Sequence, residues 1–208
     1  MGPVNDPVSA RSADHRDIVK VLATAFSQDA GFAALLPDAD SRTARLRHFF
    51  TAEAGPWALE QGWSWILRDG TEPLGAAIVL PSDRRHNPAA KHPTTVLRYV
   101  RTFDRNLLKA RRFLEVVEGA HPVEDHLYLP FIGAVAQGRG IGSSLLSALG
   151  RAADERGRPV YLEASSEESA NLYRRHGFVD TGTIMAPGMP PLRAMWRGPS
   201  GYSRDLDG

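Results

Sequence analysis

The sequence contains no cysteine among its 208 residues. Disulfides, cysteine-ligated zinc sites and iron–sulfur clusters are therefore excluded, and an acyl intermediate on a cysteine is excluded as well. The formal net charge at pH 7 is only +1. We therefore expect neither nucleic acid nor a membrane surface as a partner, because no excess of one charge sign attracts them.

The sequence also lacks long apolar segments. No apolar run approaches the ~20 residues of a membrane-spanning helix, and the first residues, MGPVNDP, show no signal-peptide core. These features predict a cytoplasmic protein. The hydrophobic content of 42% suits one domain with a substantial core. We expect a single domain over residues 1–208, with disorder in residues 1–6 and a loose tail over about 198–208.

The stretch between residues 127 and 178 organises the chain. An apolar run, Leu127–Val135, is followed by a glycine-rich loop, a helical pattern, a short apolar run at Val160–Glu163 and a second helical pattern that ends at Gly177. The apolar face of the first helix comprises Ile141, Leu145, Leu146, Leu149 and Ala152. This order of strand, loop, helix, strand and helix predicts two neighbouring strands with a helix on the sheet face.

The glycine loop is a candidate binding site. Gly138, Gly140 and Gly142 alternate just before and within the first turn of the helix. Glycine lets a ligand approach the backbone closely, and the first amides of a helix have no partner within it. The segment from Gly138 to Ser143 could therefore hold a pyrophosphate, and Arg139 either adds charge there or points to solvent.

Other interpretations of the loop remain open. It can be a plain tight connection between strand and helix. A P-loop is excluded because no Gly-Lys-Ser/Thr follows the glycines. A dinucleotide fingerprint would need a third glycine where Ser143 stands, yet Glu163 after the next strand suits a ribose-binding acid. A nucleotide-dependent oxidoreductase therefore stays an alternative.

The remaining segments predict a mixed set of elements. We expect Asp14 to cap the first helix, residues 31–38 to form a loop, and Asp69-Gly70 to lie at the turn of an antiparallel hairpin. An insert of about residues 82–122 carries a long helix broken near Asp104. The expected helices cover about residues 15–26, 41–53 and 94–118, and the further strands cover 7–13, 63–67, 74–80, 179–186 and 192–197.

Two polar features of the insert are better explained by exposure to solvent than by binding of a metal or a phosphate. His86 and His92 lie in a polar loop without a carboxylate or cysteine pattern, so no metal site is expected. A basic helix face follows, which is more typical of a solvated amphipathic helix than of a phosphate site. Its residues are Arg98, Arg101, Arg105, Lys109 and Arg112.

At two places the chain resembles the GNAT N-acetyltransferases. The family's acetyl-coenzyme A motif Q/R-x-x-G-x-G/A is similar to the stretch that begins at Gln137, and its Tyr-x-x-x-Gly-Phe element resembles the segment from Tyr173 to Phe178. The closest resemblance is to the puromycin N-acetyltransferase-like branch. The cofactor-binding residues that this implies in the loop are Gln137, Gly138, Arg139, Gly140, Ile141, Gly142 and Ser143.

The resemblance implies an α/β (α+β) fold with a mixed, largely antiparallel central sheet and helices on both faces. The sheet would be splayed between the strand at residues 127–135 and the strand at 160–163, and acetyl-CoA would lie in the splay. Backbone amides of Ile132, Gly133 and Ala134 would hold the pantetheine and polarise the thioester. Only Val135 and Ala136 separate these residues from the motif, which implies a tighter turn than is usual in the family.

The resemblance also assigns residues on the last helix. Tyr173 would be the general acid beside the cofactor sulfur. Asparagines that close relatives carry seven and four residues before this tyrosine are replaced here by Ser166 and Ser169, so either hydroxyl could contact pantetheine, and Asn171 is a further candidate. The general base stays open. Its candidates are Glu124, Asp125, His126 and Glu163.

The function that the sequence predicts is N-acetylation of the amine of a small molecule. Direct transfer from acetyl-CoA in a ternary complex is expected, because no cysteine and no Ser-His-Asp arrangement can carry the acetyl group. A non-catalytic acyl-CoA-binding module is a second alternative. The sheet edge or the helical insert could support a homodimer.

Overall fold

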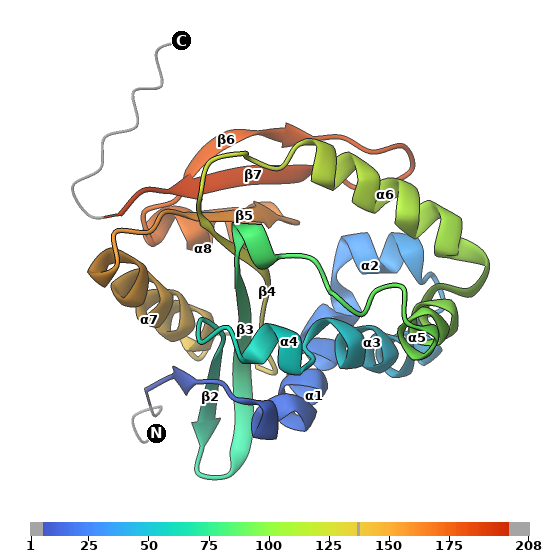
Figure 1. The fold of residues 1–208 in the computed structure, drawn as a ribbon, viewed down its shortest axis with the longest axis horizontal. Coiled ribbons are helices and arrows are strands. Elements are labelled where there is room, and N and C mark those ends of the chain that lie inside the picture. Colours follow the sequence, from blue (N-terminus) through green and yellow to red (C-terminus); the bar gives the residue numbers. More distant parts are fainter. Residues whose placement is uncertain (1–5, 137, 200–208) are drawn as a thin grey trace.

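The fold is a single seven-stranded sheet with helices on both faces (Figure 1). The computed structural model describes residues 6–136 and 138–199, so the predictions for residues 1–5, Gln137 and 200–208 lie outside it. The strand order is β1-β2-β3-β4-β5-β7-β6, and only the β4–β5 pair is parallel. The strands are β1 (Val8–Ser9), β2 (Trp65–Asp69), β3 (Glu72–Pro81), β4 (Leu127–Ala134), β5 (Val160–Ala164), β6 (Val179–Ile184) and β7 (Leu192–Arg197). The predicted fold class is confirmed.

Helices cover the two faces unequally. The α-helices are α1 (His15–Ala25), α2 (Ala30–Leu35), α3 (Ala39–Glu53), α4 (Pro56–Leu59), α5 (Pro93–Phe103), α6 (Leu107–Gly119), α7 (Ile141–Glu155) and α8 (Glu167–Arg175). The first six lie toward one face and α7 and α8 toward the other, with α6 crossing near β7 and β6 (Figure 1). None of the described helices is long and apolar enough to cross a membrane.

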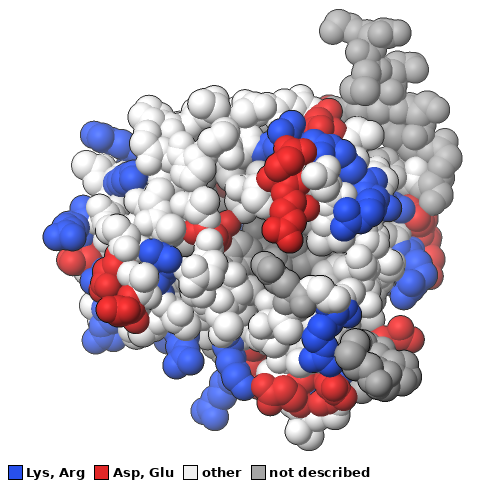
Figure 2. Space-filling model, turned by 180° about the vertical axis from the view of Figure 1, so that it is seen from behind, with Lys and Arg blue, Asp and Glu red and all other residues white. Residues whose placement is uncertain are grey.

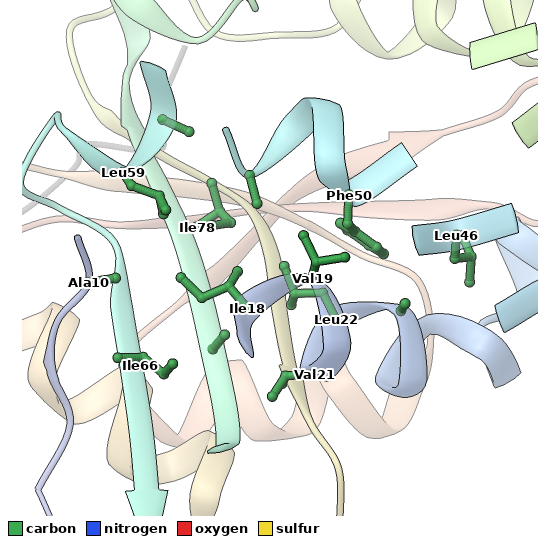
Figure 3. Packing of buried hydrophobic residues seen from close by; sticks show 14 of the residues in the cluster. Ala10, Ile18, Val19, Val21, Leu22, Leu46, Phe50, Leu59, Ile66 and Ile78 are labelled. Atoms are coloured by element: carbon green, nitrogen blue, oxygen red, sulfur yellow. The ribbon is translucent and has the colours of Figure 1, made fainter. Parts of the chain in front are cut away.

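The core under α1 is built from aliphatic side chains and phenylalanines. Ile18 and Leu22 of α1 are fully buried and belong to one apolar cluster with Phe50 of α3 and Ile78 of β3 (Figure 3). The centroid of the Phe50 ring lies 5.1 Å from the centroid of the Phe131 ring on β4. Burial of each such side chain contributes roughly 1.5–3 kcal/mol, so this cluster holds α1 and α3 firmly against the sheet.

The second core joins α7 and α8 to the opposite face. The five apolar residues predicted for the first helix after the glycine loop are all buried, as their helical spacing indicated. Gly75 of β3 permits this packing, because a Cβ atom there would lie 2.4 Å from the Cγ2 atom of Ile141. Helix α7 therefore approaches the sheet closely at its N-terminal turn.

The expectations for the N-terminal half are partly wrong. Residues 31–38 do not form a continuous loop, because α2 occupies Ala30–Leu35 and the Asp29 side chain accepts a hydrogen bond from the Phe32 amide at 2.9 Å. Six residues are too few for a helical period to show. Asp14 precedes α1 but makes no side-chain cap, since its carboxylate accepts from the Arg11 amide at 2.8 Å and from Arg68 at 2.9 Å.

Two other local expectations are confirmed. Strands β2 and β3 form an antiparallel hairpin across the Asp69-Gly70 turn, where Gly70 has φ 58°. The long helix of the insert breaks at Asp104, whose φ of 48° is the only positive value at a non-glycine residue among those described. The break separates α5 from α6 and lets α6 run back over the sheet.

Candidate active site

The two central strands separate after only two residue pairs. Strands β4 and β5 pair at Leu127↔Val160 and Tyr128↔Tyr161 and not beyond. On the other side of β4, Leu129 and Pro130 stand opposite a single residue of β3, so β4 carries a bulge at this point. Proline has no amide hydrogen to continue a ladder. The bulge and the proline together explain why the sheet opens here, and a proline inside an apolar strand was the available sequence signal.

The open edge of β4 presents backbone groups to the splay. The Val135 amide donates to the Leu74 carbonyl of β3 at 2.9 Å. Because strand residues alternate in direction, the amide of Gly133 also faces β3, while those of Ile132 and Ala134 face the splay. Gly133 has a packing role instead, since a Cβ atom there would lie 2.6 Å from the Ala25 Cβ atom. Two of the three predicted amides therefore point where a ligand would lie.

The glycine loop adopts backbone angles that favour glycine. Gly138 and Gly140 have φ values of 74° and 73°, and no heavy atom lies within 4 Å of a Cβ atom built on either. Gly140 caps α7, and its carbonyl accepts from the Ser144 amide at 2.9 Å. The space beside these two glycines is open, and the first amides of α7 have no partner within the helix, so the helix dipole favours an anion here. This arrangement fits a pyrophosphate.

The side chains in the loop serve other purposes. Ile141 is 1% exposed and belongs to the core, so only its backbone is available to a ligand. Arg139 lies 3.7 Å from the Asp69 carboxylate in the β2–β3 turn. Gly142 allows α7 to approach α8, because a Cβ atom there would lie 3.3 Å from the Leu172 Cδ2 atom. Gln137 lies outside the described residues.

Tyr173 lies on the buried face of α8, on the α7 side of the splay. It is 8% exposed, and the centroid of its ring lies 5.9 Å from the centroid of the Phe178 ring. Burial raises the pKa of the Tyr173 phenol, and the carboxylate of Asp29 raises it further. Asp29 was not expected near the site, because it precedes a helix that the sequence pattern did not reveal.

The three candidates for a pantetheine contact differ in their surroundings. Ser166 and Ser169 form a capping box at the start of α8, with the Ser166 hydroxyl accepting from the Ser169 amide at 3.1 Å. Ser169 lies one helical turn before Tyr173 and so shares its face. The amide oxygen of Asn171 accepts from Arg174 at 2.7 Å on an exposed face. Helical geometry therefore places Ser169, and not Asn171, on the face of α8 that carries Tyr173.

The surface around the site carries both signs of charge. Figure 2 shows acidic and basic side chains interleaved around a shaded recess on the face turned away in Figure 1. Near α8 the charges form a network, in which Arg174 contacts Glu167 at 2.7 Å and Asp180 at 2.8 Å, and Arg193 contacts Glu167 at 2.7 Å. Partners within the protein thus compensate much of the charge of these arginines.

The candidate bases fall into two groups. Asp125 is exposed and pairs with Arg158 at 2.7 Å, and its neighbour Glu124 is exposed as well. His126 is fully buried, and the Glu163 side chain is 6% exposed. Burial raises the pKa of Glu163 to about 7 and lowers the pKa of His126. Only Glu163 and His126 belong to a common buried cluster, which also contains His121.

Comparison with known proteins agrees with this geometry. Residues 117–180 match the family described as acetyltransferase (GNAT) domain. A crystal structure from Corynebacterium glutamicum, described as histone acetyltransferase HPA2 and related acetyltransferase, is 29% identical, with 97% of this chain and 100% of that chain covered and a TM-score of 0.68.

Two further structures share the fold at low sequence identity. The polyamine N-acetyltransferase of Drosophila melanogaster is 14% identical over 93% of this chain and 100% of that chain, with a TM-score of 0.62. Arylalkylamine N-acetyltransferase 2 from Aedes aegypti is 12% identical over 95% of this chain and 99% of that chain, with a TM-score of 0.57. Residues 117–180 are therefore similar to a GNAT acetyltransferase domain, the chain has the fold of these acetyltransferases, and the protein is an acyltransferase.

Proposed function

We propose that the protein transfers the acetyl group of acetyl-CoA directly to the amine of a small molecule in a ternary complex. The observation that carries this proposal is the presence of backbone donors on two elements beside the splay. These donors are the amides of Ile132 and Ala134 on β4 and those of the first turn of α7 after Gly140. A thioester carbonyl needs such donors as negative charge develops on its oxygen, and a pyrophosphate needs them as ligands.

Each part of the site has a distinct task in this proposal. The loop at Gly138 and Gly140 and the first turn of α7 bind the pyrophosphate. The β4 amides orient the acetyl group, and Tyr173 donates a proton to the departing sulfur. Of the candidates for pantetheine, we select Ser169, because it shares the helix face of Tyr173 while Asn171 does not.

The acceptor is a small amine in this proposal. Structures with the same fold include an agmatine N-acetyltransferase, a polyamine N-acetyltransferase and arylalkylamine N-acetyltransferases, all at identities that support the fold alone. Their range favours a basic amine without selecting one. Within the family we propose the puromycin N-acetyltransferase-like branch, on the motifs at residues 137–142 and 171–178.

The proposal is tested by measuring the release of free CoA from acetyl-CoA in the presence of a library of primary amines. We expect at least one amine to accelerate release above the rate without amine, with formation of its N-acetyl product. Thermal-shift measurements with CoA and with NAD(P) provide the comparison, since a ligand that binds the folded state raises its melting temperature. Stabilisation by NAD(P) without stabilisation by CoA, and no accelerating amine, would contradict the proposal.

A further inference from the structure

A buried polar cluster lies on the side of the splay opposite to Tyr173. On β5, Leu162 packs with Tyr173 in the α7–α8 core, whereas Tyr161 packs with Val117 of α6 on the other face. Glu163 alternates with Leu162 and therefore faces the α6 side, where Tyr128 of β4 donates to its Oε2 atom at 2.9 Å. The acid that we propose and this carboxylate thus lie on opposite faces of the opening.

The protonation of the two histidines follows from their hydrogen bonds. His126 Nδ1 must donate to the Glu124 carbonyl at 2.7 Å, because a carbonyl oxygen only accepts. Burial lowers the pKa of His126 and lowers that of His121 to about 3, so both rings are neutral near pH 7. His126 Nε2 then accepts from His121 Nε2 at 3.0 Å. The Nδ1 atom of His121 is consequently left with a lone pair.

Three polar atoms of the cluster have no hydrogen-bond partner among the described residues. They are His121 Nδ1, Glu163 Oε1 and the Tyr161 hydroxyl, and each is buried. His121 Nδ1 lies 3.9 Å from Glu163 Oε1, which is too far for a direct hydrogen bond. Burial raises the pKa of Tyr161, and the charge of the nearby Glu163 carboxylate, which attracts the Tyr161 O–H, raises it further. His121 Nδ1 and Glu163 Oε1 can only accept, and the one O–H among these atoms, that of Tyr161, is drawn to Glu163, so the His121 nitrogen is left without a donor.

A protonated primary amine supplies what this cluster lacks. An ammonium group offers three N–H donors and no acceptor, and its charge complements a carboxylate. The rings of Tyr128 and Tyr161, whose centroids are 6.0 Å apart, add faces that attract cations. We propose that Glu163, His121 and Tyr161 hold the ammonium group of the acceptor, and that Glu163 takes the proton which frees the amine for attack. This inference rests on the proposed function.

The proton balance of the transfer can be written in full. The ammonium nitrogen carries three protons, and one passes to Glu163. The nitrogen then forms the N–C bond as the C–S bond breaks. A second proton leaves the nitrogen and replaces the one that Tyr173 gives to the sulfur, and the third stays on the amide. Glu163 finally releases its proton to solvent.

The groups that surround Glu163 set the pH at which it can act. Burial raises its pKa to about 7, the hydroxyls of Tyr128 and Tyr161 lower it, and the charge of Glu118 on α6 raises it. Arg85 and His86 face His121 from the loop after β3 and disfavour its charged form. Below pH 7 the carboxyl is protonated and cannot accept, so kcat/KM for the amine should fall about tenfold per pH unit.

The test compares Glu163→Gln with wild type, and Glu118→Gln is the matched control. We expect Glu163→Gln to lower kcat/KM for the amine by roughly 10²–10⁴-fold, as for other positioned bases. The decline of kcat/KM below pH 7, which is the acidic limb of its pH profile, should also disappear. The KM for acetyl-CoA should change less than about twofold. Glu118→Gln should keep the limb but move it to lower pH, because a neighbouring negative charge is lost.

A second measurement follows binding rather than turnover. Side-chain NMR signals of His121 and His126 are recorded while butylamine is added to each protein. Wild type and Glu118→Gln should show a saturable shift of the His121 signals, and Glu163→Gln should show at least tenfold weaker binding. His121→Gln, which removes the ring but keeps a polar side chain, should weaken binding of the amine in the same direction.

The outcomes separate this inference from the proposed function. If no amine is acetylated but butylamine still shifts His121 in a Glu163-dependent way, the proposed function fails while the ammonium site stands. If amines are acetylated and Glu163→Gln keeps both its acidic limb and its butylamine affinity, the ammonium site is wrong.

Discussion

Replacement of Tyr173 by phenylalanine is the most informative single change in the proposed mechanism. The substitution keeps the ring that packs against Phe178 and removes only the hydroxyl. Among the described residues no hydrogen bond to this hydroxyl exists, so folding should lose less than about 0.5 kcal/mol. A loss of activity would then report on chemistry rather than on stability.

The magnitude follows from the proton transfer. A free thiol has a pKa of ~8.5 and a phenol ~10, so donation from tyrosine to a thiolate is uphill by about 2 kcal/mol. Burial raises the pKa of Tyr173, but the same apolar surroundings also disfavour a thiolate, which keeps the two groups comparable. Loss of a positioned acid typically costs 10²–10⁴-fold, or about 2.7–5.4 kcal/mol.

The assay is the steady-state rate of CoA release with saturating amine. Tyr173→Phe should lower kcat by that factor and leave the affinity for acetyl-CoA within about twofold. Because the pKa of Tyr173 is raised above its usual ~10, the phenol stays protonated and should produce no decline in kcat below about pH 10. If chemistry limits the rate and kcat falls less than about threefold, Tyr173 is not the acid, and another donor must protonate the sulfur.

Three further predictions concern the loop, the order of events and the packing of β4. Gly140→Val forces a branched residue into a φ of 73° beside the proposed phosphate site, so the affinity for acetyl-CoA, measured by calorimetry, should fall at least tenfold. If the folded variant binds acetyl-CoA normally, the loop does not bind the phosphates. Initial-rate lines should intersect when both substrates are varied, since transfer is direct; parallel lines with a trapped acetyl-enzyme would contradict this. Gly133→Val places side-chain atoms against Ala25 at 2.6 Å and should lower the free energy of unfolding by roughly 1–3 kcal/mol in urea titrations, whereas an unchanged midpoint would mean that α1 can shift without cost.

Local patterns in the sequence predict much of the fold. The apolar face of α7 is continuous in the helical period, and the structure buries all five of its predicted residues. The break at Asp104 and the hairpin at Asp69-Gly70 follow from short-range turn chemistry. Such features depend on neighbours in the chain, so the sequence contains the information directly. By contrast, α2 spans six residues, too few to produce a period.

The candidate site also has features that the sequence predicts and features that depend on tertiary contacts. The glycine loop and Tyr173 stand in motifs of fixed spacing, and their family resemblance is visible without coordinates. The bulge at Leu129–Pro130 depends on pairing with β3, and the approach of Asp29 to Tyr173 joins residues that are far apart in the chain. Pro130 is a local hint of the first, but the register of β4 on β3 and the approach of α2 to α8 depend on elements far apart in the chain.

The sequence motifs predict an acyltransferase-like core, with a glycine loop before a helix and a tyrosine before a Gly-Phe pair. The packed fold was needed to show which backbone amides face the splay and that Gly133 lies against Ala25. It also joined Glu163 to His121 in one buried cluster. The physical reason is that periodicity and turn chemistry act over a few residues, whereas strand register, burial and pKa arise from elements distant in sequence.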